Sequence, residues 1–112
     1  MDCIFCKIVN GEIPSKKVYE DEHVVAFQDI NPIAPVHILT IPKKHISSLL
    51  DIKEEDKALI GHLHLALQKV AEAAGVKDDG FRVITNTGPH GQQTVFHIHY
   101  HLIGGRQLEW KM

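Results

Sequence analysis

Phe96-His97-Ile98-His99-Tyr100-His101-Leu102-Ile103 places three histidines in alternation with apolar residues over a run rich in strand-forming side chains. Residues two apart in a strand share one face, so this period predicts a strand over residues 95–103 with the three imidazoles on one side. Ile98, Tyr100 and Leu102 then point to the opposite side. The stretch therefore predicts a sheet strand with one buried face and one face that carries chemistry.

The rest of the chain combines short strands with two helical segments. Further strands are predicted over residues 16–20, 23–29, 37–42 and 81–86, and a short helix over residues 3–9. A capping pair of Asp51 and Glu54, followed by apolar residues at three- and four-residue steps, predicts one long amphipathic helix over residues 51–74. Most strands lie too close in sequence for crossover helices, so we expect an antiparallel sheet of about five strands in an α+β fold.

Length and composition narrow the class of protein. The 112 residues suffice for one domain, and the formal net charge of -2 excludes the strongly basic surface of a nucleic-acid-binding protein. No apolar run approaches the ~20 residues that span a bilayer, and no secretory signal is recognised. We expect a cytoplasmic protein that binds neither nucleic acid nor membrane.

Three histidines on one strand face leave two kinds of site open. Imidazoles two residues apart lie roughly 6.5 to 7 Å apart along a strand. They can bind one metal ion together, or divide the roles of nucleophile, orienting group and proton donor around a phosphate or acyl group. Asn86, Gln93 and Thr94 precede the strand and supply the amide and hydroxyl donors that suit phosphate oxygens.

The run His97-Ile98-His99-Tyr100-His101-Leu102-Ile103 resembles the signature of the histidine triad (HIT) family, and further matches extend over nearly the whole chain. The segments that resemble its nucleotide-binding branch, called HINT, include Gly11-Glu12-Ile13-Pro14, Phe27-Gln28-Asp29-Ile30, Ile41-Pro42-Lys43-Lys44-His45 and Gly104-Gly105-Arg106-Gln107. The resemblance implies a single HIT domain over residues 1–112. It also implies a homodimer whose sheet continues across a twofold axis, with Arg106 and Trp110 near the partner's site.

The resemblance also implies an activity, the hydrolysis of purine nucleoside 5′-phosphoramidates to AMP or its analogue. His99 matches the family's nucleophile, which forms a nucleotidyl-histidine intermediate. The backbone carbonyl of His97 is expected to hold the other ring nitrogen of His99 as N–H, and His101 to donate a proton to the leaving group. His37 matches a further histidine of the proton network, and the chemistry needs no cofactor.

Nucleotide contacts follow from the same resemblance. Asp29 matches the carboxylate that accepts hydrogen bonds from the ribose hydroxyls. Asn86, Gln93 and Thr94 match phosphate contacts, although the family commonly has serine at the last position. The residues that resemble the purine slot are Ile4, Phe5, Ile8, Phe27 and Ile30; without the resemblance their apolar character indicates core.

Cys3 and Cys6 form a Cys-x-x-Cys pair, which from the residues alone is half of a zinc site, a redox pair or two packed small side chains. Some HIT members and the related galactose-1-phosphate uridylyltransferases resemble this chain in combining such cysteines with two histidines. The resemblance thus implies a structural zinc held by Cys3, Cys6, His45 and His97.

Two other functions remain open at this stage. One is a dinucleoside polyphosphate hydrolase of the same family, although the ending Gly104-Gly105-Arg106-Gln107 favours the phosphoramidate branch. The other is a nucleotide-binding interaction module whose turnover is incidental.

Overall fold

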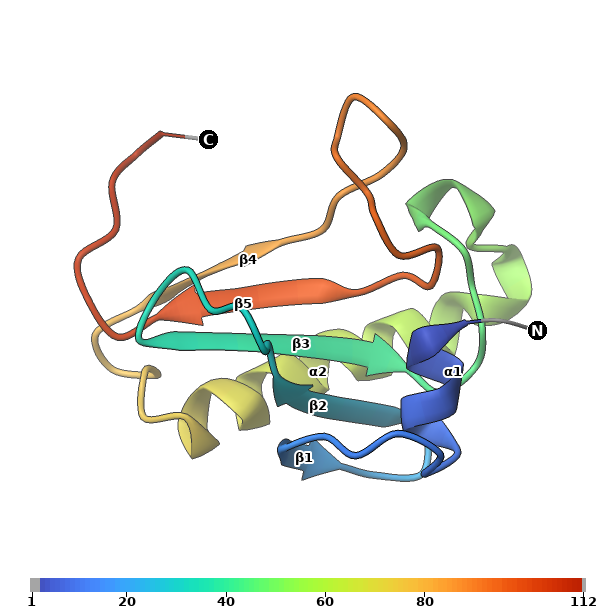
Figure 1. Ribbon diagram of the computed structural model, residues 1–112, viewed down its shortest axis with the longest axis horizontal. Coiled ribbons are helices and arrows are strands. Elements are labelled where there is room, and N and C mark those ends of the chain that lie inside the picture. The colour runs from blue at the N-terminus through green and yellow to red at the C-terminus, as the bar shows by residue number, and fades with distance from the viewer. Residues whose placement is uncertain (1–2, 112) are drawn as a thin grey trace.

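A computed structural model describes residues 3–111, in which five strands form one antiparallel sheet (Figure 1). The strands are β1 (Lys17–Glu20), β2 (Val24–Gln28), β3 (Val36–Pro42), β4 (Phe81–Ile84) and β5 (Tyr100–Gly104), in the spatial order β1-β2-β3-β5-β4. Two helices, α1 (Ile4–Val9) and α2 (Lys57–Ala73), complete the fold with two 3-10 turns, Leu49–Asp51 and Glu54–Asp56. The predicted α+β fold is confirmed. Within residues 3–111, no helix combines the length and apolarity that crossing a membrane requires.

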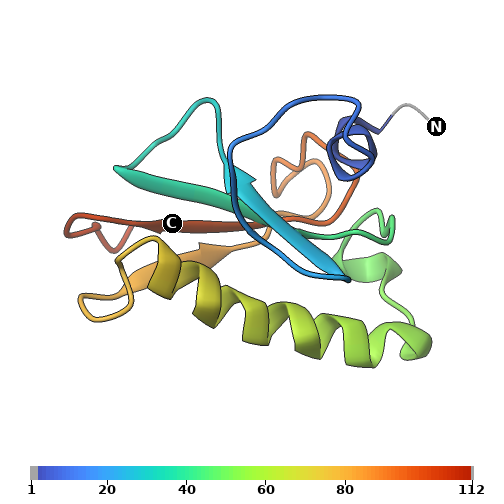
Figure 2. The ribbon, with the colours of Figure 1, turned by 90° about the horizontal axis from the view of Figure 1, so that it is seen from below.

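The two helices lie on opposite faces of the sheet, as Figure 2 shows. The long helix α2 covers one face and buries a core that includes Leu63, Leu67 and Val70. The short helix α1 covers part of the other face and buries a second cluster that includes Phe5 and Ile8. The central strands β2, β3 and β5 are therefore largely buried on both faces, and the second face carries the candidate site.

The start of the long helix differs from the prediction. Asp51 ends the first 3-10 turn, residues 52–53 are irregular, residues 54–56 form the second turn, and α2 begins at Lys57. Asp51 does not pair with Glu54; its carboxylate instead accepts a hydrogen bond from Ser48 Oγ at 2.7 Å. The backbone N–H of Lys53 donates to Asp56 Oδ2 at 3.0 Å, so Asp56 provides the carboxylate of the capping interaction.

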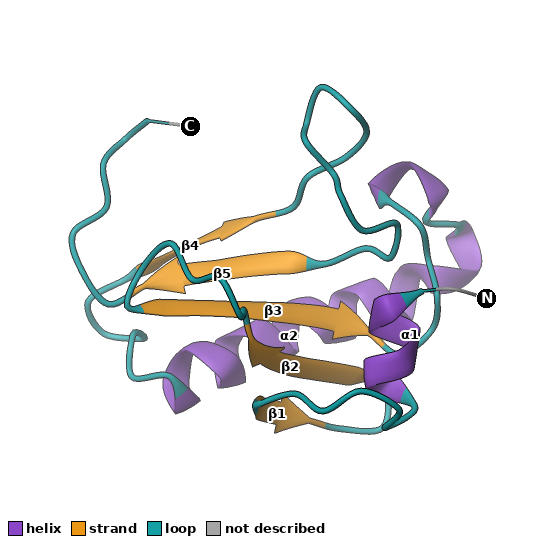
Figure 3. Cartoon of the chain, in the orientation of Figure 1, coloured by secondary structure: helices purple, strands orange, loops and turns teal. Residues whose placement is uncertain are grey.

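The histidine stretch is a regular strand only from Tyr100 onward, so the predicted start at residue 95 is wrong (Figure 3). β4 ends at Ile84, which pairs with His101, so β4 offers no strand partner to residues 97–99. The alternation survives in this extended segment. Ile98 lies in the α2 core, while the Phe5 ring contacts the His97 and His99 rings on the other face.

Candidate functional site

His99 lies just before β5, buried beneath α1. Its Nδ1 lies 2.7 Å from the backbone oxygen of His97. A carbonyl can only accept, so Nδ1 carries the hydrogen and Nε2 of the neutral ring keeps its lone pair. The Phe5 ring packs edge-on against His99, with 5.1 Å between ring centroids, and restricts how the imidazole rotates. This is the carbonyl contact that the sequence resemblance implied, and it leaves a nucleophilic nitrogen free.

A second cluster joins three elements beside His99. Nε2 of His37 on β3 lies 2.9 Å from Nδ1 of His101 on β5 and 3.3 Å from Oδ2 of Asp29, which follows β2. The rings of His99 and His101 lie 5.2 Å apart between centroids. Burial lowers the pKa of His101 to about 4, with further contributions from His99 and His37 that exceed the opposing effect of Asp29. His101 is therefore neutral near pH 7.

The Asp29, His37 and His101 cluster has the residue types of a metal site, but its hydrogen bonds exclude one. The backbone N–H of Ile33 donates to Nδ1 of His37 at 3.1 Å. A neutral imidazole has one hydrogen, which must then lie on Nε2, the atom that faces the cluster. A protonated nitrogen cannot bind a metal ion. The cluster is a hydrogen-bonded relay.

Four predicted metal ligands converge between α1 and the turn after β3. Nδ1 of His97 lies 3.4 Å from Sγ of Cys3 and 3.6 Å from Sγ of Cys6. Nδ1 of His45 lies 3.3 Å from Sγ of Cys6 and 3.3 Å from Nδ1 of His97. Tetrahedral zinc separates a nitrogen and a sulfur ligand by ~3.5 Å and two nitrogen ligands by ~3.3 Å. The donor set and its spacing fit zinc.

The surroundings of His97 also suit a metal ligand. Its Nε2 lies 2.8 Å from the backbone oxygen of Pro42, which fixes the hydrogen on Nε2 and turns the Nδ1 lone pair toward the thiols. Burial lowers the pKa of His97, which favours the neutral, metal-binding form. When bound, zinc supplies a structural crosslink between Cys3 and Cys6 at α1 and the segment that carries His99.

The structure brings together only part of the predicted purine slot. Phe5, Ile8 and Phe27 are buried in one cluster under α1, and the Phe5 and Phe27 rings meet edge-on at 5.5 Å between centroids. Ile4 is 48% exposed and Ile30 is 92% exposed. The two exposed side chains are free to contact a base, whereas the three buried ones already pack against each other.

The predicted phosphate contacts in the loop between β4 and β5 differ in burial and in hydrogen bonding. Gln93 is buried, and its amide nitrogen donates to the backbone oxygens of Ser47 at 2.7 Å and Val95 at 3.1 Å. Both amide hydrogens are thus used inside the protein. Asn86 donates to the Gly91 oxygen at 2.8 Å and keeps a second hydrogen. Gln93 therefore braces the loop.

Thr94 is exposed and lines a hollow of about 390 Å³, whose wall also includes Ile4, Phe96, Cys3 and His45. Its hydroxyl has no partner among the hydrogen bonds that we find within residues 3–111. Of the predicted phosphate contacts, the Thr94 side chain is the most open to a ligand.

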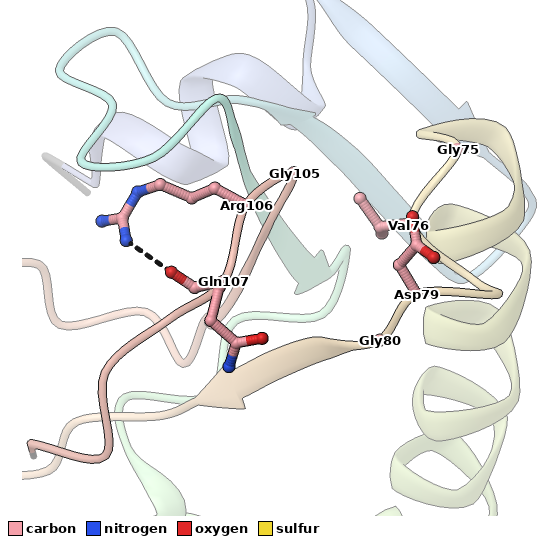
Figure 4. A pocket seen from close by; sticks show the side chains of 7 residues that line it. All are labelled: Gly75, Val76, Asp79, Gly80, Gly105, Arg106 and Gln107. Carbon is pink, nitrogen blue, oxygen red and sulfur yellow. Dashed lines mark hydrogen bonds between the residues drawn. The ribbon is translucent and has the colours of Figure 1, made fainter.

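A larger hollow of about 440 Å³ lies at the other end of β5 (Figure 4). Its lining residues are Gly75, Val76, Asp79, Gly80, Gly105, Arg106 and Gln107. Arg106 turns back onto its own segment, where Nη1 donates to the Gln107 oxygen at 3.1 Å. None of the predicted catalytic, nucleotide-binding or metal residues lines this hollow.

Sequence reasoning missed three groups that position the site. The Ile33 amide and the Pro42 carbonyl belong to the backbone, and no side-chain pattern reveals them. The Thr85 hydroxyl donates to the backbone oxygen of His99 at 2.9 Å, where β4 has ended and no ladder bond is available. A polar residue at the end of a predicted strand was the one available signal.

Comparison with known proteins agrees with this geometry. A family model of the HIT domain matches residues 10–108. A 14 kDa zinc-binding protein of Brassica juncea is 50% identical over 111 residues, which cover 97% of each chain.

Two solved structures are also similar over nearly their whole length. A histidine triad protein from Clostridium difficile has a TM-score of 0.95 at 53% identity and covers 100% of this chain and 97% of its own. A HIT family hydrolase from Legionella pneumophila has a TM-score of 0.94 at 46% identity, with 97% of both chains covered. The chain belongs to the histidine triad (HIT) family.

Proposed function

We propose that this protein hydrolyses the P–N bond of purine nucleoside 5′-phosphoramidates and releases AMP when the nucleoside is adenosine. The observation that carries the proposal is the 2.7 Å contact between Nδ1 of His99 and the His97 oxygen, which leaves Nε2 of His99 as a free nucleophile. The similarity to a HIT family hydrolase supports a hydrolytic reaction.

In the first step, the Nε2 lone pair of His99 forms a bond to the α-phosphorus. The bond to the leaving nitrogen breaks, its electron pair stays on that nitrogen, and the nitrogen takes a proton from Nε2 of His101. The His97 oxygen stabilises the positive charge that develops on the nucleotidyl-histidine ring. That positive charge offsets the negative charge left on the His37–His101 pair.

In the second step, water attacks the phosphorus of the nucleotidyl-histidine. Its proton returns to His101, and the electrons of the P–Nε2 bond return to His99. Both rings then regain their starting states, so the protein turns over without a cofactor in the chemistry.

The nucleotide is proposed to lie along the face under α1. Asp29 accepts hydrogen bonds from the ribose hydroxyls, Ile4 and Ile30 contact the purine, and Thr94 with Asn86 contacts the phosphate. Exposure of Ile4, Ile30 and Thr94 supports these roles. For Gln93 we propose an indirect role, in which its buried amide holds the phosphate loop in shape.

We further propose that Cys3, Cys6, His45 and His97 hold one structural zinc ion. The distances from His97 and His45 to the other ligand atoms, which fit tetrahedral zinc, support this, as does the relative named a zinc-binding protein. We also propose a homodimer, which the free edge of β4 supports.

The test is incubation of the protein with adenosine 5′-phosphoramidate and, separately, with a dinucleoside polyphosphate. We expect AMP from the phosphoramidate and much slower cleavage of the dinucleotide. Faster cleavage of the dinucleotide would show that the protein is a dinucleoside polyphosphate hydrolase and reject the proposed function. Tight AMP binding without turnover would instead favour an interaction module.

A further inference from the structure

Hydrogen bonds through His37 and His101 all run in one direction, and they begin at a backbone amide. The N–H of Ile33 donates to Nδ1 of His37 at 3.1 Å. Nε2 of His37 then faces Nδ1 of His101 at 2.9 Å. The Ile33 side chain is 66% exposed, so the contribution of this residue to the site is its N–H.

The direction follows from what each group can do. An amide N–H only donates, so Nδ1 of His37 must accept, and the single hydrogen of the neutral ring lies on Nε2. That hydrogen points to Nδ1 of His101, which must accept in turn. The hydrogen of neutral His101 is then on Nε2, the nitrogen that does not face His37.

We propose that the backbone N–H of Ile33 is a positioning group that fixes the tautomers of His37 and His101 and thereby keeps a hydrogen on Nε2 of His101. The inference rests on the proposed function only for the use of that hydrogen, which is donation to the leaving nitrogen.

Without the Ile33 donor, the donor and acceptor roles of His37 and His101 can be reversed. His37 then carries its hydrogen on Nδ1, and its Nε2 accepts from Nδ1 of His101. Nε2 of His101 is left with a lone pair and no hydrogen for the leaving group. The Ile33 amide favours one of the two directions because it donates to Nδ1 of His37.

The other groups around the pair favour the same direction or are neutral to it. Oδ2 of Asp29 lies 3.3 Å from Nε2 of His37, and its negative charge also favours a hydrogen on that nitrogen. The His99 ring packs against His101 and has its own Nδ1 committed to the His97 oxygen. Among these groups, only the Ile33 amide contacts Nδ1 of His37.

The loop between β2 and β3, which carries this amide, can be followed in Figure 1. The N–H of Asn31 donates to Oδ1 of Asp29 at 2.8 Å, and the N–H of Asp29 donates to the His37 oxygen at 3.0 Å. These bonds tie the loop to the start of β3. The loop thus places a donor of fixed direction behind His37.

Ile33→Pro removes the N–H, and Ile33→Ala is the matched control that keeps it. Tautomers are read by ¹⁵N NMR of histidine-labelled protein near pH 7, without substrate. Wild type and Ile33→Ala are expected to have hydrogen on Nε2 and none on Nδ1 in both His37 and His101. Ile33→Pro is expected to show more hydrogen on Nδ1 of both rings than Ile33→Ala does. Its kcat for the phosphoramidate should fall by about tenfold, a fraction of the range for acid–base catalysis, while KM changes less than about twofold.

Unchanged tautomers in Ile33→Pro would overturn the inference whatever its kcat, as would the same change of tautomers in Ile33→Ala. Should the proline variant not fold, an ester in place of the Ile33 amide removes the same hydrogen and keeps the side chain. The two proposals fail separately. A wild type without AMP release rejects the proposed function, while the NMR result alone decides whether Ile33 sets the tautomers.

Discussion

At the scale of single residues, His97 connects the candidate metal centre to the candidate nucleophile. Its Nδ1 faces the two thiols, its Nε2 donates to the Pro42 oxygen, and its own oxygen holds the His99 ring. Each of these three atoms has a different partner. The roles that we propose for the three histidines of the triad are therefore unequal: His97 positions, His99 attacks, and His101 donates.

Gln92 is the one non-glycine with a left-handed backbone among residues 3–111, at φ 61°. This conformation costs a non-glycine residue about 1–2 kcal/mol. Glycine avoids that cost, but part of the gain is offset because glycine loses more conformational entropy on folding. We predict that Gln92→Gly raises the free energy of unfolding by about 0.5–1 kcal/mol, measured by urea denaturation.

The neighbouring Gly91→Ala is the contrasting variant. A Cβ at Gly91 would lie 2.5 Å from the Thr87 oxygen, so it should destabilise the protein by about 1–3 kcal/mol. Equal effects of the two substitutions would contradict this account of the loop.

At the scale of elements, α1 is too short to be stable without contacts to the rest of the protein. It has six residues, too few for a stable isolated helix, and Cys3 caps it by accepting from the Cys6 amide at 3.3 Å. Protein purified without chelator is predicted to contain about one zinc per chain, because the four ligands form one tetrahedral site. Cys6→Ser should lose the metal and speed hydrogen exchange of the α1 amides.

The control for this prediction is Lys7→Ala, on the same helix but outside the ligand set. It should keep the metal and the slow exchange. Metal-free wild type, with α1 exchanging as slowly as the rest of the core, would contradict the role given to the four ligands.

Asp21 links the β1–β2 hairpin to α2. Burial alone would raise the pKa of its carboxyl, but hydrogen bonds from Tyr19, His62 and two backbone amides hold the pKa well below its usual range. A folded-state pKa below the unfolded value means stability that is present above about pH 4 and lost as the pH falls further. Asp21→Asn should cost about 1 kcal/mol at pH 7 after solvent screening.

The measurement compares urea denaturation of wild type and Asp21→Asn at pH 7 and pH 3. The difference between them should shrink at pH 3. Glu22→Gln, an exposed neighbour, should change little at either pH. A difference for Asp21→Asn that does not depend on pH would show that the charge of the Asp21 carboxylate is not the cause.

At the scale of the whole molecule, side-chain pattern predicted the architecture well. The alternation in the histidine stretch and the period of α2 identified the sheet and its covering helix. The prediction failed at the ends of two elements, where local hydrogen bonds set the boundary. The histidine stretch joins the sheet only at Tyr100, and α2 begins after Asp56 and not at Asp51. The Ile33 amide could not be predicted either, because it is a backbone group that no side-chain pattern reveals.

Tertiary contacts, which the sequence does not show, determine how the predicted site residues are used. Those that resemble the zinc ligands converge from positions up to 94 residues apart, which local sequence cannot show. Gln93 was expected to contact phosphate, but the buried amide satisfies its hydrogens inside the protein. Residue type predicted the hydrogen-bonding capacity of Gln93, and tertiary contacts decided where it is used.

β4 is an edge strand whose backbone and apolar side chains, such as Phe81 and Val83, remain exposed. Such an edge readily pairs with a second strand. We predict a dimer by sedimentation equilibrium that Val83→Lys weakens, whereas Lys17→Ala on the opposite edge strand does not. A wild-type monomer at all concentrations would contradict the proposed homodimer.

The central claim is that His99 forms the bond to phosphorus. Its most direct test is a rapid alkaline, denaturing quench of the protein during turnover of adenosine 5′-phosphoramidate, because the P–N bond of a nucleotidyl-histidine breaks in acid. Mass spectrometry of the intact chain and of its peptides, kept at alkaline pH, follows. The account predicts an adenylyl group on the peptide with His99 in wild type, and neither adduct nor AMP with His99→Ala. Full AMP release by His99→Ala, or an adduct on another residue, would contradict it.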